Sequence, residues 1–525
     1  MLSPVYQKFP IVLEKGNGCY VWDLDGKQYL DLMGGYGVSL VGHSNEKVVE
    51  AIYNQATKLI SCHGSFYNEQ RSKTVKKLHK ITPKHLDNIY LCNSGTEAIE
   101  AALKLCKKNS TNKIMSMSGS YHGKTIGSLS LTWNPKYKKS FKPLLDNIEF
   151  ITFGSVESLD QIDENTGSVF LEVIQGESGV KFASNEYFIK LQEQCNKNNV
   201  LLVVDEIQTG LGRTGKMWAH EHYGLKPDIL CIGKGLAGGL PVGAILYRSD
   251  LLNFSLGEHT TTFGGNPLTS AATNATIDYL LNENLVDNAA KIGEIFLNGL
   301  SDLRSKYDFI RDVRGLGLMI AVESRFPIKD ILYDALSHGL IMLYSGKNIL
   351  RFLPPLILTE NEVKESLEIF IQYFKTMIIE VNYQMDDIDK QIIDILIKDS
   401  RTKNTIIAQK VGLSEGSVRE RIQKLVSSGI VTKYTIDTKY NTPAAFTLIK
   451  LDNTQSLSQI NSELKSINEI DSLYSITGEF DLLLIFSIDD KILLFKTLEK
   501  IRQIPGIADI VTSSILVTID KNKDD

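Results

Sequence analysis

The sequence predicts an α/β protein of two or three domains, and three observations support this prediction. The chain has 525 residues, which is too long for one ordinary hydrophobic core. Up to about residue 380, short apolar runs alternate with helical stretches, as in a parallel α/β sheet. After that point come about 50 residues of helical pattern and then a smaller mixed α/β pattern.

Composition sets the broad class. The apolar share of 43% and the charged share of 23% are ordinary for globular domains. A formal net charge of -5 argues against a protein coated by nucleic acid but permits one basic patch. The six cysteines are scattered without a C-x-x-C pair, so we expect neither a metal site nor disulfides. We see no signal peptide and no membrane-spanning run, and we expect a cytoplasmic protein.

Five apolar runs of the first region each end in polar or glycine residues. They are NIYLC before NSGTEA, KIMSMS before GSYHGKT, SVFLEVI before QGE, NVLLVV before DEIQTG, and DILCIG before Lys234. Open α/β sheets build ligand sites at the carboxyl ends of their strands. Any one of these ends could be a simple loop, but the five together favour a ligand site at one edge of the sheet.

The segment Ser94-Gly95-Thr96 precedes EAIEAALKLCKK, a strong helix former. These residues are therefore expected at a helix N-terminus, where free N–H groups and the helix dipole attract a phosphate. Taken alone, an ordinary Ser/Thr helix cap is the simpler interpretation.

Asp205 and Lys234 each follow a buried apolar run. A carboxylate is costly to bury without a cation, and a desolvated lysine becomes a nucleophile toward aldehydes. Together with a phosphate cradle they provide what pyridoxal 5'-phosphate requires, and the glycines around Lys234 would leave room for cofactor and substrate. The alternative is a buried structural salt bridge.

The motifs NSGTEAIEAALK, YHGKT, VDEIQTGLGRTG, GKGLAGGLPVGA and HTTTFGGNPL resemble those of class III aminotransferases of the ornithine and acetylornithine type. The resemblance covers about residues 5 to 380. It implies the α/β architecture called fold type I, pyridoxal 5'-phosphate as cofactor, and a homodimer with active sites at its interface.

The resemblance also implies roles around the cofactor ring. Lys234 would be the catalytic Schiff-base lysine and Asp205 the partner of the ring nitrogen. Gln208 would touch the ring hydroxyl, and Tyr121 would stack on the ring, where many relatives have phenylalanine. His122, in the same motif as Tyr121, is also assigned to cofactor binding.

The phosphate end of the cofactor is assigned to a second group of residues. By resemblance, Gly95 and Thr96 would hold the phosphate, and Thr262 of the neighbouring subunit would help them. Ser94, beside them at the expected helix N-terminus, is also assigned to cofactor binding. Without the resemblance, Thr262 would be interpreted only as part of a glycine-rich turn.

Substrate binding is assigned to three residues. Arg351, in LRFLPPL, matches the arginine that binds the α-carboxylate of the amino or oxo acid, and Glu177 matches the glutamate that gates it. From the sequence alone, a surface arginine with a solvated partner is the alternative. Lys124 stands where many relatives have an arginine that grips substrate carboxylate, and lysine lacks the bidentate fork.

Further likeness indicates a subfamily. GYGVSLVGHSN, GSLSLTWNPKYKKSFKPL and LRFLPPLIL resemble the aminotransferases of the lysine route through α-aminoadipate and of the matching arginine route. Those enzymes transfer an amino group from glutamate to a terminal semialdehyde held on an acidic amino-group carrier protein, LysW. An acetylornithine or ornithine aminotransferase that acts on free small molecules is the alternative.

A domain boundary follows the first region. Thr359 to Glu362 is predicted to be a capping box that starts a helix, and a new pattern begins near Asp386. We expect an aminotransferase over 1–382, a helix-turn-helix over 386–440 and a ligand-sensing α+β domain over 441–525.

The second region begins with a helix-turn-helix pattern. Asn404 and Ser414 are expected N-caps, and Gly412 lies in the turn between the helices. The candidate recognition helix carries Ser417, Arg419 and Arg421, which are predicted to contact duplex DNA. The reason is that basic residues outnumber acidic residues between Arg401 and Lys439, which suits contacts to phosphates. A helical packing module that binds no nucleic acid is the alternative.

The stretch from about 386 to 525 resembles the Lrp/AsnC regulators. AAFTLIKLD, IDSLYSITGEFDLLLIFSI and GIADIVTSSILVTI would be strands of a βαββαβ ligand-sensing domain. By resemblance, small amino acids would bind near Gly478 to Asp481, between subunits.

Two further functions compete with an aminotransferase that carries a DNA-binding tail. One is a transcription regulator whose aminotransferase-like part only senses ligand, and the other is a different pyridoxal enzyme such as an aminomutase. The complete set of Lys234, Asp205, Gln208 and Arg351 argues against the first, and Arg351 with Glu177 argues against the second.

Overall fold

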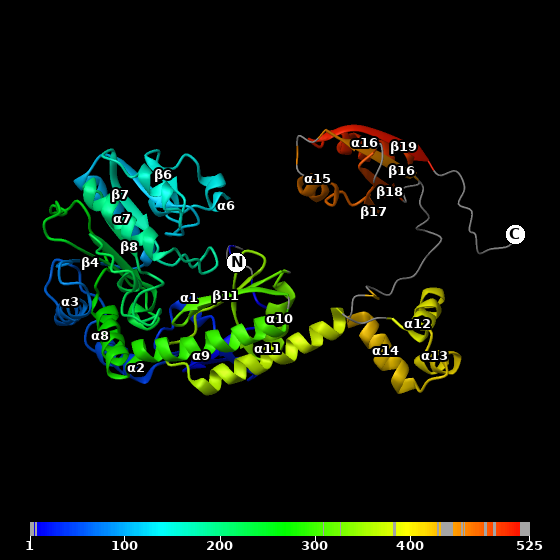
Figure 1. Ribbon diagram of the computed structural model, residues 1–525, viewed down its shortest axis with the longest axis horizontal. Coiled ribbons are helices and arrows are strands. Elements are labelled where there is room, and N and C mark those ends of the chain that lie inside the picture. The colour runs from blue at the N-terminus through cyan, green and yellow to red at the C-terminus, as the bar shows by residue number, and fades with distance from the viewer. Residues whose placement is uncertain are drawn as a thin grey trace. The chain divides into compact units, whose positions relative to one another are not determined.

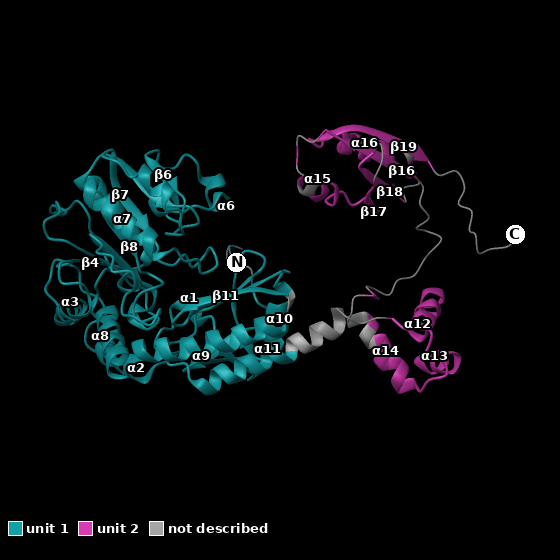
Figure 2. Cartoon of the chain, viewed as in Figure 1, with its two compact units in different colours: residues 1–378 teal, residues 379–525 magenta. Residues whose placement is uncertain are grey.

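The computed structural model describes residues 5, 8–307, 309–325, 327–381, 385–427, 430–431, 445–452, 455, 457–476, 480–486 and 490–514. The chain divides into two compact units, Met1–Ile378 and Ile379–Asp525 (Figure 2). Within the described residues, no helix is long and apolar enough to cross a membrane.

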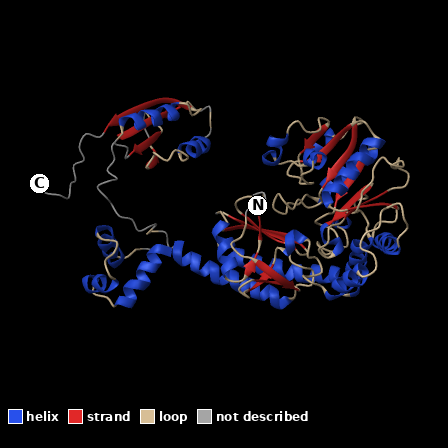
Figure 3. Ribbon diagram, turned by 180° about the vertical axis from the view of Figure 1, so that it is seen from behind, coloured by secondary structure: helices blue, strands red, loops and turns tan. Residues whose placement is uncertain are grey.

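The first unit is built around a seven-stranded sheet with the order β4-β10-β9-β8-β7-β5-β6 (Figures 1 and 3). Its strands are β4 (Asn88–Cys92), β5 (Lys113–Met117), β6 (Ile148–Ile151), β7 (Thr166–Leu171), β8 (Leu201–Asp205), β9 (Ile229–Gly233) and β10 (Gly243–Tyr247). The five predicted strands are all present as β4, β5, β7, β8 and β9. They belong to this one sheet, so the predicted α/β class is confirmed.

The sheet is not wholly parallel, as the sequence pattern had suggested. Strand β10 runs antiparallel to both of its neighbours, β9 and β4. The reason is the short connection, because only 234–242 join β9 to β10. A parallel return needs a crossover of a dozen or more residues, whereas an antiparallel return does not.

The central strands β7, β8, β9 and β10 are buried almost throughout, so apolar residues predominate in them. In β8, Val203 packs in the same cluster as Ala98 and Ile99 of helix α4 (Gly95–Asn109). Leu202 and Val204 belong instead to the larger cluster that contains helix α7 (Asn185–Lys197). Alternate residues of a strand point to opposite faces, so α4 and α7 cover opposite sides of the sheet.

The rest of the first unit adds two four-stranded sheets and several helices. One sheet has the order β1-β2-β3-β13 and the other β11-β12-β15-β14. Their strands are β1 (Leu13–Asn17), β2 (Tyr20–Asp23), β3 (Gln28–Asp31), β11 (Ile310–Leu316), β12 (Met319–Ser324), β13 (Leu340–Ile341), β14 (Leu343–Ser345) and β15 (Ile349–Phe352). The helices are α1 (Gly34–Gly37), α2 (Glu46–Ala56), α3 (Glu69–Ile81), α5 (Ile126–Leu131), α6 (Pro135–Lys138), α8 (Pro267–Asn282), α9 (Leu285–Lys306), α10 (Lys329–Ser337) and α11 (Glu360–Val381). Short 3-10 turns occur at η1 (Lys139–Phe141), η2 (Glu157–Gln161), η3 (Ala219–His222) and η4 (Lys234–Ala237).

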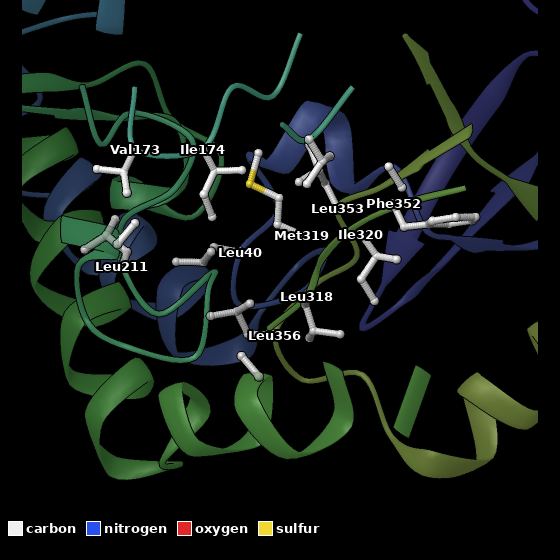
Figure 4. Packing of buried hydrophobic residues seen from close by; sticks show 14 of the residues in the cluster. Leu40, Val173, Ile174, Leu211, Leu318, Met319, Ile320, Phe352, Leu353 and Leu356 are labelled. Carbon is white, nitrogen blue, oxygen red and sulfur yellow. The ribbon is translucent and has the colours of Figure 1, made fainter. Parts of the chain in front are cut away.

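One core joins the large sheet to the smaller sheet that contains β12 and β15. Val173 and Ile174, just after β7, are in the same buried cluster as Met319 of β12 and Leu353 after β15 (Figure 4). The ends of β7 and β15 are therefore held by a common core.

The predicted capping box is present at the start of α11. The Glu362 carboxylate accepts from the Thr359 N–H at 2.7 Å, and the Thr359 hydroxyl accepts from the Glu362 N–H at 3.5 Å.

The second unit begins with three helices, α12 (Asp387–Lys398), α13 (Asn404–Val411) and α14 (Glu415–Ser427). Gly412 has φ +71 between α13 and α14, which is the left-handed conformation of a helix-ending glycine. Ser414 caps α14 as predicted, whereas α13 begins at Asn404 with Lys403 in the cap position. The helix-turn-helix pattern is therefore present in the structure.

The remainder of this unit has the predicted βαββαβ order. Its elements are β16 (Ala445–Leu451), α15 (Leu457–Leu464), β17 (Ser472–Ser475), β18 (Leu482–Phe486), α16 (Lys491–Arg502) and β19 (Ile507–Ser514). They form an antiparallel sheet with the order β17-β18-β16-β19. Gly478 and Glu479 of the predicted ligand loop lie outside the described residues.

Candidate active site

A cavity of about 300 Å³ lies where strands of the large sheet end. Nine of the twelve predicted residues of the first region line it, together with Gly123, Glu172 and Ile207. The nine are Gly95, Thr96, Tyr121, His122, Lys124, Glu177, Asp205, Gln208 and Lys234. They come from the ends of several different strands, so the cavity depends on the sheet being formed.

Asp205, the last residue of β8, is held by two hydrogen bonds. Its Oδ2 lies 2.8 Å from Nδ1 of His122, and its Oδ1 accepts from the Ile207 N–H at 3.0 Å. A carboxylate only accepts, so the proton between the two side chains is assigned to Nδ1. His122 Nε2 is buried and has no partner among the described residues. The pair therefore presents a fixed carboxylate to the cavity.

Lys234 follows β9 directly and has φ +45, a left-handed conformation that is uncommon for a side-chain-bearing residue. Burial, together with the positive charge of Arg351, lowers the pKa of Lys234 to about 8. Backbone strain of this kind is retained where the surroundings enforce it, often at functional sites. Near neutral pH part of the Lys234 amine is therefore unprotonated, which is the form that reacts with an aldehyde.

The glycines around Lys234 do not line the cavity, contrary to our expectation that they leave room for ligand. A Cβ on Gly233 would lie 3.3 Å from the Gly95 Cα, and a Cβ on Gly235 would lie 2.7 Å from the Leu40 Cβ. Gly238 has φ +57 in the turn toward β10. These glycines therefore allow close packing and a turn behind the lysine.

The N-terminus of α4 lies at another side of the cavity. Gly95 and Thr96 line it, whereas the Ser94 hydroxyl accepts from the Glu97 N–H at 3.3 Å as a helix cap. The Thr96 hydroxyl lies 2.7 Å from that of Ser128. A Cβ on Gly123 would lie 2.4 Å from the Thr96 Oγ1, so only glycine fits there. The free N–H groups of the first helical turn suit an anion.

Arg351, on β15, is fully buried and pairs with Glu177, whose Oε1 accepts from Nη2 at 2.9 Å. Its Nε and Nη1 atoms have no partner among the described residues. Burying a guanidinium with unused donors is costly. The arrangement leaves donors for a further acceptor, while Glu177 lines the cavity.

Lys124 lines the cavity and is exposed, so it marks the side at which the cavity opens to solvent, its mouth, and two tyrosines lie beside it. The Lys124 Nζ lies 4.6 Å from the ring centroid of Tyr137 and 5.9 Å from that of Tyr121. The two rings meet edge to face at 6.1 Å. Tyr137, on α6, was not among the predicted site residues.

Glu172 is a second residue that the sequence analysis missed. It lines the cavity just after β7, and its Oε2 accepts from the Tyr121 N–H at 3.1 Å. Burial, followed by the charge of Asp205, raises the pKa of Glu172 well above its ordinary value. A carboxylate inside the apolar run SVFLEVI was the available signal, since such a residue needs partners when buried.

Thr262 lies away from this cavity within the single chain. It lines a different hollow, together with Asn93, Glu97 and His259. Its predicted contact belongs to a neighbouring subunit and stays a prediction.

The predicted DNA-contacting residues lie on α14 and differ in their surroundings. Arg419 is exposed and pairs with Glu415 one turn away. Arg421 instead donates from Nη1 to Asp386 at 2.8 Å and to Asp389 at 2.9 Å. The Asp389 side chain is buried, so Arg421 holds α12 against α14. The Ser417 N–H donates to the capping Ser414.

The seven-stranded α/β sheet, with a lysine, an aspartate and a helix N-terminus around a cavity at its strand ends, is the arrangement of an aminotransferase. The chain belongs to the class-III aminotransferase family, which matches residues 1–374. Residues 385–426 match the AsnC-type helix-turn-helix domain, and residues 444–524 match the Lrp/AsnC ligand binding domain. The resemblances stated from the sequence are therefore confirmed.

Relatives with known names span most of the first unit. A [LysW]-aminoadipate semialdehyde/glutamate semialdehyde transaminase from Sulfurisphaera tokodaii is 43% identical over 359 residues, covering 68% of this chain and 92% of the relative. An acetylornithine aminotransferase from Caldanaerobacter subterraneus is 38% identical over 377 residues, covering 70% and 95%. The crystal structure of an ornithine aminotransferase from Toxoplasma gondii has a TM-score of 0.69 and 32% identity, covering 72% and 93%.

Class-III aminotransferases of this type use pyridoxal 5'-phosphate, and it is the cofactor of this chain. The donor set of the cavity suits this group. A fixed carboxylate, an amine with a pKa of about 8 and a helix N-terminus line one cavity of about 300 Å³. The buried Nε2 of His122 adds a polar atom without a partner among the described residues.

Proposed function

We propose that the protein transfers an amino group from glutamate to the terminal semialdehyde of a lysine or ornithine precursor whose α-amino group is carrier-linked or acylated. The observation that carries this proposal is one cavity containing Lys234, Asp205 with His122, and Glu177 paired to the buried Arg351. A cofactor lysine alone fits many reactions. Beside the lysine, Arg351 could bind a substrate carboxylate, and Glu177 occupies it when no such carboxylate is present. This arrangement favours an enzyme that alternates between two different substrates.

The cofactor-facing roles follow from the hydrogen bonds. Bound pyridoxal 5'-phosphate supplies an electron sink when its ring nitrogen is protonated. Asp205, oriented by His122 Nδ1, would hold that proton. Lys234 would bind the cofactor aldehyde and then accept and return a proton, which its pKa of about 8 permits. Tyr121 and Gln208 would contact the ring.

The phosphate end would be held by the N–H groups of Gly95 and Thr96. Ser94 supports them indirectly, since its hydroxyl caps the same helix. We also propose that Thr262 completes the site of a second subunit in a homodimer.

Arg351 and Glu177 would discriminate between the two substrates. When Glu177 moves aside, Arg351 offers Nε, Nη1 and Nη2 to the α-carboxylate of glutamate. When the semialdehyde end of the second substrate enters, no carboxylate replaces Glu177 and the ion pair persists. Lys124, near the mouth, is suited to the distal anionic part of a substrate, as a point charge without a fork.

The name of the Sulfurisphaera tokodaii relative supports a substrate linked to the carrier LysW, whereas that of the Caldanaerobacter subterraneus relative supports free acetylornithine. An amino-acceptor screen with glutamate as donor distinguishes them. We expect 2-oxoglutarate to form with carrier-linked aminoadipate or glutamate semialdehyde. Turnover of N-acetylglutamate semialdehyde alone, without turnover of the carrier-linked substrates, favours the acetylornithine reaction. Absence of turnover with every semialdehyde contradicts the proposal.

We further propose that the second unit binds duplex DNA and an amino-acid effector, with domains at 386–440 and 441–525. The helix-turn-helix and the exposed Arg419 support DNA binding. Removing all residues after 380 should abolish DNA binding and leave transamination intact, because the cavity lies wholly in the first unit. Loss of transamination in the truncated protein contradicts this separation.

A regulator that only senses ligand through its first unit is the second candidate, favoured by the same two DNA-regulator matches. It predicts glutamate binding without production of 2-oxoglutarate.

A further inference from the structure

A lysine-rich segment lies beside the cavity mouth and takes no part in the chemistry described above. From Trp133 to Lys142 the chain carries four lysines and no acidic residue. The lysines are Lys136, Lys138, Lys139 and Lys142, on α6, on η1 and just after it. We call this segment, 133–142, the lysine segment (α6 in Figure 1).

The lysines of this segment differ from other lysines of the first unit in having no acidic partner. Within the described part of the chain, none of the four has a carboxylate oxygen within 4.0 Å, whereas Lys113 pairs with Glu149 and Lys190 with Asp160. Burial and the charge of Lys142 lower the pKa of Lys138. The segment therefore concentrates positive charge that the fold does not neutralise.

The same surface contains aromatic side chains, one of which is exposed. Four lysines, Trp133, Pro135 and Phe150 line a hollow of about 560 Å³. Trp133 and Phe150 meet edge to face at 5.1 Å, and the Lys138 Nζ lies 4.4 Å from the Phe150 centroid. Trp133 is 44% exposed. Aromatic side chains are enriched in protein interfaces, and clustered charge steers an oppositely charged partner.

The lysine segment is joined to the active site by one residue. Tyr137 lies between Lys136 and Lys138, and its ring meets Tyr121 at 6.1 Å and Lys124 at 4.6 Å. Tyr121 and Lys124 both line the cavity. A macromolecule bound to the lysines would therefore stand next to the path by which its attached group enters the cavity.

We infer that the lysine segment is the docking surface for an acidic protein that delivers the substrate as a covalently attached group. The inference deepens the proposed function and rests on its carrier-linked form. An acidic protein surface meets all three observations, since it neutralises the lysines, covers Trp133 and places its attached group beside Tyr137. A small substrate held inside the cavity would leave Trp133 uncovered and these lysines without an acidic partner.

The test compares two substrates in matched double variants. Lys136→Glu/Lys139→Glu reverses two exposed charges of the segment. Lys197→Glu/Lys226→Glu makes the same change in charge at the end of α7 and in the loop before β9. Both positions precede the strands β8 and β9, so they lie toward the edge of the sheet opposite the cavity. The substrates are the LysW carrier bearing glutamate semialdehyde and N-acetylglutamate semialdehyde, with glutamate as donor.

We expect the Lys136→Glu/Lys139→Glu enzyme to lose about 10- to 100-fold in kcat/KM with the carrier-linked substrate at low salt, mostly through KM. With the acetylated substrate, both variants should stay within about twofold of the wild type, which also shows that they are folded. Added salt should reduce wild-type kcat/KM for the carrier-linked substrate and reduce the difference between wild type and variant.

Three results would overturn the inference. One is an unchanged KM for the carrier-linked substrate in the Lys136→Glu/Lys139→Glu enzyme, and another is an equal loss in the control variant. The third is a loss of affinity for duplex DNA with carrier turnover intact, which would assign the surface to nucleic acid. In each case wild-type turnover of the carrier-linked substrate leaves the proposed function standing, whereas absence of that turnover removes its carrier-linked form.

Discussion

Two arginines, one in each unit, form ion pairs of opposite construction. Arg351 is fully buried, and its partner Glu177 has a side chain that is 32% exposed. Arg421 has a side chain that is 27% exposed, and one of its partners, Asp389, is only 1% exposed. In the first pair the cation is buried and the acid reaches solvent, and in the second pair these positions are reversed.

This difference indicates what each pair does. Glu177 can leave Arg351 for solvent, and a substrate carboxylate can take its place on the same donors. If Arg421 leaves, the buried Asp389 carboxylate loses a cation that offsets its charge, which is unfavourable. We therefore interpret the Arg351 pair as an exchangeable gate and the Arg421 pair as a fixed link between two helices.

An exchangeable gate at Arg351 has a role only if the first unit catalyses transamination. The variant Lys234→Ala tests that catalysis and should have the largest effect. We expect turnover to fall by about 10³-fold or more, because the variant lacks the amine that would bind the cofactor and transfer protons. The absorbance band of the bound cofactor should change as well. Circular dichroism should show an intact fold, and turnover that persists with the wild-type band would remove Lys234 from the site.

The gate is tested by Arg351→Ala. The KM for glutamate and 2-oxoglutarate should rise, with a loss of roughly 2–5 kcal/mol in binding if the charge-assisted pair is desolvated. Cofactor absorbance should stay the same. Glu177→Gln is the matched control, since it weakens the guard and keeps the arginine. It should impair selection between the two substrates more than it impairs glutamate binding. Equal kinetics for wild type and Arg351→Ala would contradict the gate.

The fixed link is tested by comparing two neighbouring arginines of α14. Arg421→Ala should lower the melting temperature of the three-helix part of the second unit, followed in the full chain, by about 4–8 °C. Arg419→Ala should leave melting unchanged, weaken DNA binding across sequences and reduce the salt slope by about one. If Arg421→Ala melts like wild type and loses only DNA affinity, the arginine is a DNA contact.

The smallest expected effect is a shift in pH dependence. The cofactor aldehyde reacts with the neutral amine of Lys234, so capture of added pyridoxal 5'-phosphate by cofactor-free protein should accelerate as pH rises, with a midpoint at about 8. Arg351→Gln removes a positive charge that lowers this pKa, and the midpoint should move to higher pH. A midpoint unchanged by the substitution would show that the two charges do not interact.

Much of the cavity could be predicted from the sequence because it follows a local rule. Apolar runs that end in polar or glycine residues place those residues at one edge of a sheet, and nine of the twelve predicted residues line the cavity there. Helix caps such as Ser94 and Ser414 are equally local, since their partners lie three residues away.

The features that were missed depend on contacts between distant segments. Arg421 meets Asp386 and Asp389 across more than thirty positions, so its pattern on the helix suggested a free cation. The glycines near Lys234 are required by Gly95 and Leu40, which approach from far along the chain. The direction of β10 depends on the length of its connection, which apolar periodicity does not report.

The central claim is that the first unit is a working aminotransferase with a gated carboxylate site. It is tested most directly by mixing purified cofactor-loaded protein with glutamate alone and measuring 2-oxoglutarate in a single turnover. We predict about one 2-oxoglutarate per cofactor-loaded site in the wild type, and a reaction that requires far higher glutamate in Arg351→Ala. Glutamate that binds without forming 2-oxoglutarate would contradict the account and favour a protein that only senses its ligand.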